Sequence, residues 1–114
     1  MSTKYGNQKV TIEGQTFDSR REAHEYIFLR AKEQAGEISN LRLQPKFVLV
    51  EGFEYFGERV RGITYKPDFA YTDEDGREVV VEVKGGKATQ TEAYKLRAKL
   101  FKKQFPHIWL EVVE

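Results

Sequence analysis

The stretch of sequence that decides the fold runs from Thr64 to Gly86 and reads TYKPDFAYTDEDGREVVVEVKGG. Two runs rich in strand-forming residues flank an acidic turn that contains a glycine, which predicts a β-hairpin. Three charged residues, Asp68, Glu82 and Lys84, nevertheless occupy strand positions. They need an explanation, because charges buried on a sheet must be paired or must bind a metal.

Two turns fit the middle of this hairpin, and they place the charges differently. A two-residue loop at 75–76 would put Asp68 opposite Val83, because a shift of one residue moves a strand side chain to the other face. A three-residue loop at 74–76 puts Asp68 opposite Glu82. The register therefore determines whether the two carboxylates can act together.

The hydrophobic pattern favours the three-residue loop, in which Gly76 is left-handed and Asp73 pairs with Arg77. One face of the hairpin is then continuously apolar and predicts the core side: Phe69, Tyr71, Val79, Val81 and Val83. The opposite face is expected to be poor core material because of its charges: Asp68, Ala70, Val80, Glu82 and Lys84. A salt-bridge cluster in solvent is the alternative interpretation of these charges.

The rest of the chain indicates one domain over residues 1–114, with 1–9 as a loose lead-in. Its 114 residues, 39% of them hydrophobic, are enough for a single core. No apolar run approaches the roughly 20 residues of a membrane span and no signal peptide opens the chain, so we expect a soluble, cytoplasmic protein. The chain has no cysteine and two histidines, so a metal would be held mainly by carboxylates, which favours Mg²⁺ or Mn²⁺.

The predicted elements mix strands with two helices. In order they are a short strand at 9–17 with a turn at Gly14, a helix from Ser19 to about Gly36, several strands between 45 and 72 broken by Gly52, Gly57 and Gly62, the strand at 77–84, a helix from Thr89 to just before Pro106, and a last strand at 108–113. Each helix has an apolar side, formed by Ala23, Tyr26, Ile27, Leu29 and Ala31 in the first and by Tyr94, Ala98, Phe101 and Phe105 in the second. We expect an α+β or α/β fold, with a central mixed sheet and one helix from each end of the chain.

The charged end of the hairpin has the residue types of a metal site. Two carboxylates that face each other raise each other's proton affinity unless a cation lies between them. Asp68 and Glu82 would therefore suit a divalent metal, and the carbonyl of Val83 could complete its ligands. Lys84 points the same way as Glu82, because the two residues are two apart on a strand. Its ammonium could orient an attacking water and stabilise charge on a phosphate.

Pro67-Asp68 and Glu82-Val83-Lys84 resemble the two signature elements of the PD-(D/E)xK nuclease superfamily. The resemblance implies a restriction-endonuclease-like αβββαβ core. It also implies a Mg²⁺-dependent or Mn²⁺-dependent DNA endonuclease, in which Asp68 and Glu82 bind one or two metal ions and Lys84 positions the nucleophilic water.

Many members of this superfamily carry a further glutamate on the first helix, and the resemblance implies the same role for Glu22. Glu22 would bind the metal directly or through water, as part of the catalytic set. The alternative is that Glu22 only completes a capping box with Ser19. Glu25, one turn further on, is the substitute if the helix is rotated.

A narrower resemblance covers residues 17–106. The segments FDSRREAHEY, LQPKF, YKPDF, VEVKG and TEAYKLRAKLFKKQFP, in this order, are similar to a small phage-encoded family of unknown function in the superfamily, and to phage Holliday-junction resolvases. This resemblance implies a phage enzyme of DNA recombination or repair that acts on branched DNA. It further implies a homodimer that works in the host cytoplasm.

The basic residues of the chain are concentrated near the second helix. Residues 84–105 include seven basic residues and one acidic residue. Lys95, Lys99 and Lys102 form one stripe of the predicted helix, and Lys87 precedes it. These lysines are our candidates for contacts with DNA phosphates, although a solvated helix face is the alternative.

One glutamine and four aromatic residues are further candidates for contacts with DNA. Gln90 and Tyr94 fit the Q-x-x-x-Y pattern that follows E-x-K in RecB-type exonucleases, which implies a place beside the active site, although Tyr94 also suits the core. Phe53, Tyr55 and Phe56 predict a hairpin that could touch bases or a partner subunit.

Two other classes of function remain open. One is a nucleic-acid-binding module that keeps the nuclease fold without cleaving, and the other is a structural or regulatory phage protein that binds another protein. The joint presence of Asp68, Glu82 and Lys84 favours the enzyme over both.

Overall fold

The computed structural model describes residues 9–84 and 91–114. Within them the elements are β1 (Val10–Ile12), β2 (Gln15–Phe17), α1 (Arg20–Gln34), β3 (Ser39–Leu43), β4 (Phe47–Val50), β5 (Phe53–Tyr55), β6 (Glu58–Val60), β7 (Ile63–Tyr65), β8 (Phe69–Thr72), β9 (Glu78–Val83), α2 (Glu92–Gln104) and β10 (Trp109–Val113). The predicted lead-in at 1–9 lies almost entirely outside the described residues. No helix in the described parts of the chain is long and apolar enough to cross a membrane.

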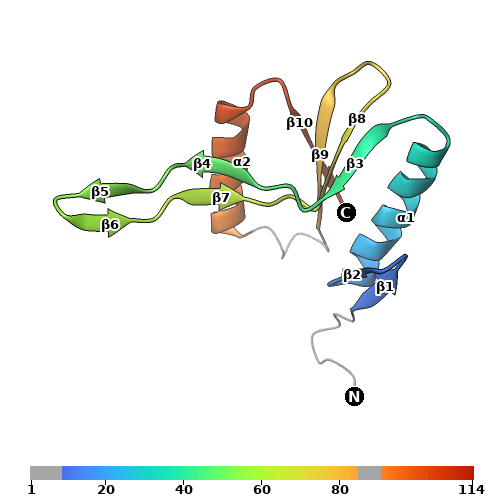
Figure 1. The fold of residues 1–114 in the computed structure, drawn as a ribbon, viewed down its shortest axis with the longest axis horizontal. Helices are drawn as coiled ribbons and strands as arrows, with labels where there is room; N and C mark the ends of the chain where they lie inside the picture. Colours follow the sequence, from blue (N-terminus) through green and yellow to red (C-terminus); the bar gives the residue numbers. More distant parts are fainter. Residues whose placement is uncertain (1–8, 85–90) are drawn as a thin grey trace.

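The central sheet has four strands in the order β10-β9-β8-β3. β10 is parallel to β9, whereas β8 is antiparallel to β9 and β3, so the sheet is mixed. Parallel neighbours need a crossover connection, and α2 lies in the one between β9 and β10. The order α1, β3, β8, β9, α2, β10 confirms the predicted α+β fold with an αβββαβ arrangement (Figure 1).

The register of the β8–β9 hairpin is the one that a three-residue loop produces. Phe69 lies opposite Val81, in a ladder that continues to the turn. Gly76 has a φ of 83°, in the left-handed region that glycine adopts without steric cost. The N–H of Asp73 donates to the carbonyl of Arg77 at 2.9 Å. The predicted register is therefore confirmed.

Both faces of the β8–β9 hairpin are buried in hydrophobic clusters. The predicted apolar face packs under α1, in a cluster that contains Phe69, Val79 and Val81. The expectation that the other face would be poor core material was wrong for its middle, because Ala70 and Val80 are fully buried there under α2. The charged residues Asp68, Glu82 and Lys84 are confined to one end of the hairpin, so the sheet is buried between two helical layers and these charges lie at its rim.

Helix α1 begins as predicted, because the Ser19 hydroxyl accepts the N–H of Glu22 at 3.1 Å. Its buried side is narrower than predicted. Ile27 is 50% exposed and Ala31 is exposed, whereas Glu25 is buried. The helix therefore packs on the sheet along one narrow stripe. This stripe includes Glu25, whose carboxylate is paired with Arg21.

Helix α2 starts later than predicted. Its N-cap is Thr91, whose hydroxyl accepts the N–H of Tyr94 at 3.1 Å. The predicted cap, Thr89, lies outside the described residues. The predicted apolar side is confirmed, with Ala98 and Phe101 buried and Phe105 partly buried.

Residues 47–65 form a two-stranded arm that leaves the sheet beside α2 (Figure 1). The near half, β4 with β7, packs on α2, whereas the far half, β5 with β6, ends in exposed aromatic residues, including Phe56 at 94% exposure. The two sides of the arm approach each other closely at Gly62, where a Cβ would lie 2.3 Å from the Val50 carbonyl oxygen. This close approach of the backbone requires glycine. The predicted hairpin of aromatic residues is confirmed, and its contact with bases or a subunit stays a prediction.

Candidate functional site

The candidate site lies at the end of the sheet where β8 begins and β9 ends. Asp68 immediately precedes β8, and its backbone N–H donates to the Val81 carbonyl at 2.9 Å. Its carboxylate accepts the N–H of Val83 at 2.7 Å. Val83, which was expected to offer its carbonyl to a metal, thus meets Asp68 through its N–H. These two hydrogen bonds fix Asp68 at the end of the hairpin.

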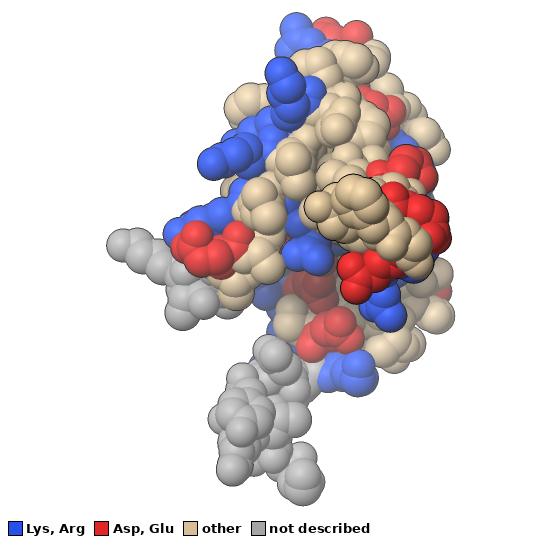
Figure 2. All heavy atoms as spheres, turned by 90° about the vertical axis from the view of Figure 1, so that its left-hand side faces the viewer, with Lys and Arg blue, Asp and Glu red and all other residues tan. Residues whose placement is uncertain are grey.

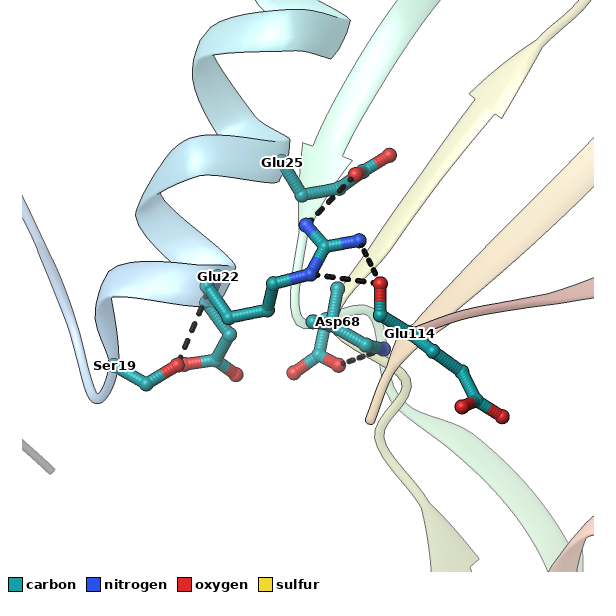
Figure 3. A network of polar contacts seen from close by, with 7 residues as sticks. Ser19, Glu22, Glu25, Asp68 and Glu114 are labelled. Atoms are coloured by element: carbon teal, nitrogen blue, oxygen red, sulfur yellow. Dashed lines mark hydrogen bonds and ion pairs between the residues drawn. The ribbon is translucent and has the colours of Figure 1, made fainter. Parts of the chain in front are cut away.

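Glu22 approaches Asp68 from α1. Figure 3 shows the two carboxyl groups turned toward each other across the gap between the helix and the sheet. Burial, a hydrogen bond with Glu22 and repulsion from the charges of Glu82 and Glu22 raise the pKa of Asp68 to about 8, against a lowering by the Val83 N–H. Asp68 therefore holds a proton more tightly than an exposed aspartate does, because its charged form is poorly solvated and lies near other carboxylates.

Glu22 also retains the capping role that was the alternative explanation. Its backbone N–H is bonded to Ser19, and its carboxylate accepts the N–H of Asp18 at 3.2 Å. Both interpretations of Glu22 are thus compatible with the geometry. Glu22 and Asp68 line one cavity of about 210 Å³, together with residues of β2 and of the end of β3.

Glu25, the substitute for Glu22, points elsewhere. It is buried, and Arg21 Nη1 donates to it at 3.4 Å. The same guanidinium donates to the carbonyl of Glu114 at 2.6 and 3.0 Å (Figure 3). Arg21 thus ties α1 to the end of the chain, and Glu25 serves this link.

Glu82 lies on the α2 side of the same sheet end and meets two donors. The Tyr65 hydroxyl donates to its Oε1 at 2.5 Å, and Lys84 Nζ lies 3.4 Å from its Oε2. Lys84 Nζ also lies 3.8 Å from the centre of the Tyr94 ring, a cation–π contact. The Glu82 and Lys84 side chains are only 12% and 11% exposed. Glu82 and Lys84 thus form a mostly buried ion pair in which Glu82 is also hydrogen-bonded to Tyr65, and not the solvated cluster that was the alternative.

The structure brings the predicted catalytic residues into one neighbourhood, in two groups. The expectation that Asp68 shares one face with Glu82 and Lys84 was wrong. Asp68 precedes β8, bonds to the Val83 N–H and lies with Glu22 on the α1 side, whereas Glu82 and Lys84 lie on the α2 side. The groups are near enough that the charge of Glu82 raises the pKa of Asp68 and that of Tyr94. Glu82 makes its direct contacts with Tyr65 and Lys84.

The carboxylates suit an oxygen-preferring cation, because a divalent charge would favour the ionised form of Asp68, which burial and the neighbouring carboxylates disfavour. In residues 9–84 and 91–114, however, no three aspartates, glutamates, histidines or cysteines converge into a formed metal centre. Across the same residues every buried side-chain nitrogen and oxygen has a hydrogen-bond partner. A metal at Glu82 would therefore replace its contacts with Tyr65 and Lys84.

The predicted DNA-contact residues have different surroundings. Lys95, Lys99 and Lys102 are exposed and line one groove between α2 and β10, whose floor includes Ala98. Figure 2 shows the face from which the arm projects. Lysine and arginine side chains gather along one side of this face, and most of the acidic side chains lie on the other side. Tyr94 is half-buried beneath Lys84, while Lys87 and Gln90 lie outside the described residues.

The sequence patterns missed Tyr65. It is 4% exposed on β7, and its ring packs edge-on against Phe101 at 5.6 Å between centroids. In the sequence, only its position three residues before Asp68 could have pointed to Tyr65, and such a spacing is too common to single out a residue. Arg97 was also missed; its Nε donates to the Thr64 carbonyl at 2.9 Å and holds β7 to α2.

The comparisons with known proteins identify the family. No curated protein matches the chain, and no solved structure matches it. One family model does, and it covers residues 2–114, so the chain belongs to DUF1064, described as a protein of unknown function.

Proposed function

We propose that this protein is a metal-dependent DNA endonuclease that hydrolyses phosphodiester bonds, with branched DNA as its preferred substrate. The observation that carries the proposal is the grouping of three carboxylates and one lysine at a single end of the sheet. The charges of Glu22 and Glu82 help burial to raise the pKa of Asp68, and Lys84 is buried against Glu82. An acid with a raised pKa beside other carboxylates and a buried lysine is typical of a catalytic site.

The carboxylates and Lys84 have separate roles in this proposal. Asp68, Glu82 and Glu22 would hold Mg²⁺ or Mn²⁺, which supplies an activated water and stabilises charge on the phosphate. Lys84 is positioned by Glu82 and by the Tyr94 ring, and its ammonium orients the water and offsets negative charge beside the phosphate. Because these groups are mostly buried, their electrostatic effects are stronger than they would be in water.

The resemblance to the PD-(D/E)xK superfamily supports this function. Asp68, and Glu82 with Lys84, resemble its two signature elements, and the αβββαβ order of the elements suits the same superfamily. The similarity to phage Holliday-junction resolvases supports a homodimer that acts in DNA recombination or repair. The exposed lysines of α2 supply a surface for DNA phosphates.

The test is a cleavage assay on four-way junction, duplex and single-stranded DNA, with Mg²⁺, Mn²⁺ or EDTA. We expect metal-dependent cleavage by the wild type, a loss of about 100-fold or more in Asp68→Asn and Lys84→Met, and little change in the matched control Arg77→Met at the exposed end of the same hairpin. Binding of DNA without cleavage of any substrate would reject the enzyme.

A non-cleaving nucleic-acid-binding module is the second candidate, and one observation favours it. Both oxygens of Glu82 already have protein partners, Tyr65 and Lys84. A site satisfied in this way could serve only to stabilise the fold. In that case Asp68→Asn and Lys84→Met would leave DNA affinity unchanged, and the wild type would show no metal-dependent activity.

A further inference from the structure

We propose that Tyr65 is a positioning residue that fixes the carboxylate of Glu82 in the orientation that the site requires. This inference rests on the proposed function, because it concerns how Glu82 would present itself to a divalent metal. Tyr65 is not among the residues that the sequence patterns or the superfamily resemblance single out. It acts through Glu82 and does not itself contact substrate.

The contacts of Glu82 are the first step. The Tyr65 hydroxyl donates to Oε1 at 2.5 Å, while Lys84 Nζ lies 3.4 Å from Oε2. Two donors on different oxygens fix the plane of a carboxylate, whereas a single donor leaves it free to turn. Without the hydroxyl, the ammonium of Lys84 would be the main partner of Glu82 and would attract both oxygens.

The rigidity of Tyr65 is the second step. Its side chain is almost completely buried and packs between the rings of Phe101 and Tyr94, at centroid distances of 5.6 and 6.3 Å. Arg97 holds the neighbouring carbonyl of Thr64 at 2.9 Å. A donor locked by packing and by backbone contacts can position its partner, which a donor on a mobile side chain cannot.

The charge state of Tyr65 agrees with this role. An ordinary phenol loses its proton only at about pH 10, so the hydroxyl is a donor at neutral pH. A neutral donor holds Glu82 without cancelling its charge, so the carboxylate keeps its full attraction for a cation.

The variant Tyr65→Phe removes only the hydroxyl, and Phe fills the same space among Phe101 and Tyr94. A matched control exists on the other side of the sheet. Tyr26 is also buried, at 7% exposure, and its hydroxyl donates to a glutamate, Glu13, at 2.8 Å. Tyr26→Phe therefore removes the same kind of hydrogen bond away from the site.

The measurements are the affinity for Mn²⁺ without DNA, by calorimetry, and the kcat and KM for junction cleavage. For Tyr65→Phe we expect the Kd for Mn²⁺ to rise about tenfold and kcat to fall about tenfold, with KM for DNA within about twofold of the wild type. Tyr26→Phe should match the wild type in all three. In the Glu82→Gln background Tyr65→Phe should add no further loss, because Tyr65 acts through Glu82.

The outcomes separate this inference from the proposed function. If the wild type neither binds Mn²⁺ nor cleaves DNA, the proposed function fails. If the wild type does both and Tyr65→Phe behaves like it, or if both tyrosine variants lose equally, the positioning role alone is rejected. Should Tyr65→Phe be unfolded at the assay temperature, the Mn²⁺ affinities of Tyr65→Phe, Tyr26→Phe and the wild type are compared at a lower temperature at which all three are folded; equal affinities there would overturn the role.

Discussion

The two ends of the β8–β9 hairpin carry similar residues in different surroundings. At the turn, Asp73 Oδ1 accepts the N–H groups of Asp75 and Arg77, both at 2.9 Å. At the other end, Asp68 accepts the N–H of Val83 in the same manner. The turn is exposed, whereas the other end is covered by α1 and α2.

This difference in burial separates a structural aspartate from a candidate catalytic one. Both aspartates hold the backbone, but Asp68 is also shielded from water and faces Glu22, and burial together with the neighbouring carboxylates raises its pKa to about 8. The chemistry of the site therefore comes from its environment more than from its residue types. Three changes test this comparison.

The largest effect should be on the pH dependence of stability. Because the pKa of Asp68 is about 8 in the folded chain and near 3.8 otherwise, the folded chain holds a proton between these values that the unfolded chain has released. The stabilisation is complete below pH 4 and is lost as pH rises through about 8. The free energy of unfolding should thus fall with rising pH, by at most about 1.4 kcal/mol per unit.

Urea denaturation from pH 5 to pH 8 measures this dependence. Asp68→Asn should flatten the slope relative to the wild type, and the control Asp75→Asn, in the exposed turn, should preserve it. An equal slope in the wild type and in Asp68→Asn would show that Asp68 has no special proton affinity.

The next effect concerns ion pairs. Lys84 and Glu82 form a buried pair, whereas Arg42 and Glu78, near the turn, form one whose side chains are each 37% exposed. Lys84→Met should lower the free energy of unfolding by about 3 kcal/mol, because it leaves a carboxylate buried with one partner fewer. Arg42→Met should cost less than about 1 kcal/mol, since exposed pairs contribute little. Equal costs, measured at one pH, would contradict the difference between the two ends.

The smallest effect should come from the turn itself. Gly76 has a φ of 83°, and a Cβ there would meet open space, so the cost of a side chain is that of the backbone alone. Gly76→Ala should lower the free energy of unfolding by about 1 kcal/mol, and Gly76→Asn by less, because Asn tolerates the left-handed region. A stabilising Gly76→Ala would show that the three-residue loop is not required.

The features that the sequence predicted correctly are local. Gly76 and the alternation of the large apolar residues Phe69 and Tyr71 with smaller ones specify the loop and the register, because both depend on neighbours in the chain. The apolar side of α2 followed from a regular spacing. The first helix was harder, because Ile27 fits the pattern and yet faces solvent, while Glu25 is buried. Periodicity does not show how wide a stripe of the helix the sheet covers.

The sequence by itself determined that Asp68, Glu82 and Lys84 lie at one end of a single hairpin, since the register needs only the turn and the strands. The tertiary structure alone decided what surrounds them. Glu22 reaches Asp68 from a helix, and Tyr65 reaches Glu82 from the arm, across long separations in sequence. Burial and distant neighbours shift a pKa and orient a carboxylate, and both exist only once the helices and the arm have packed on the sheet.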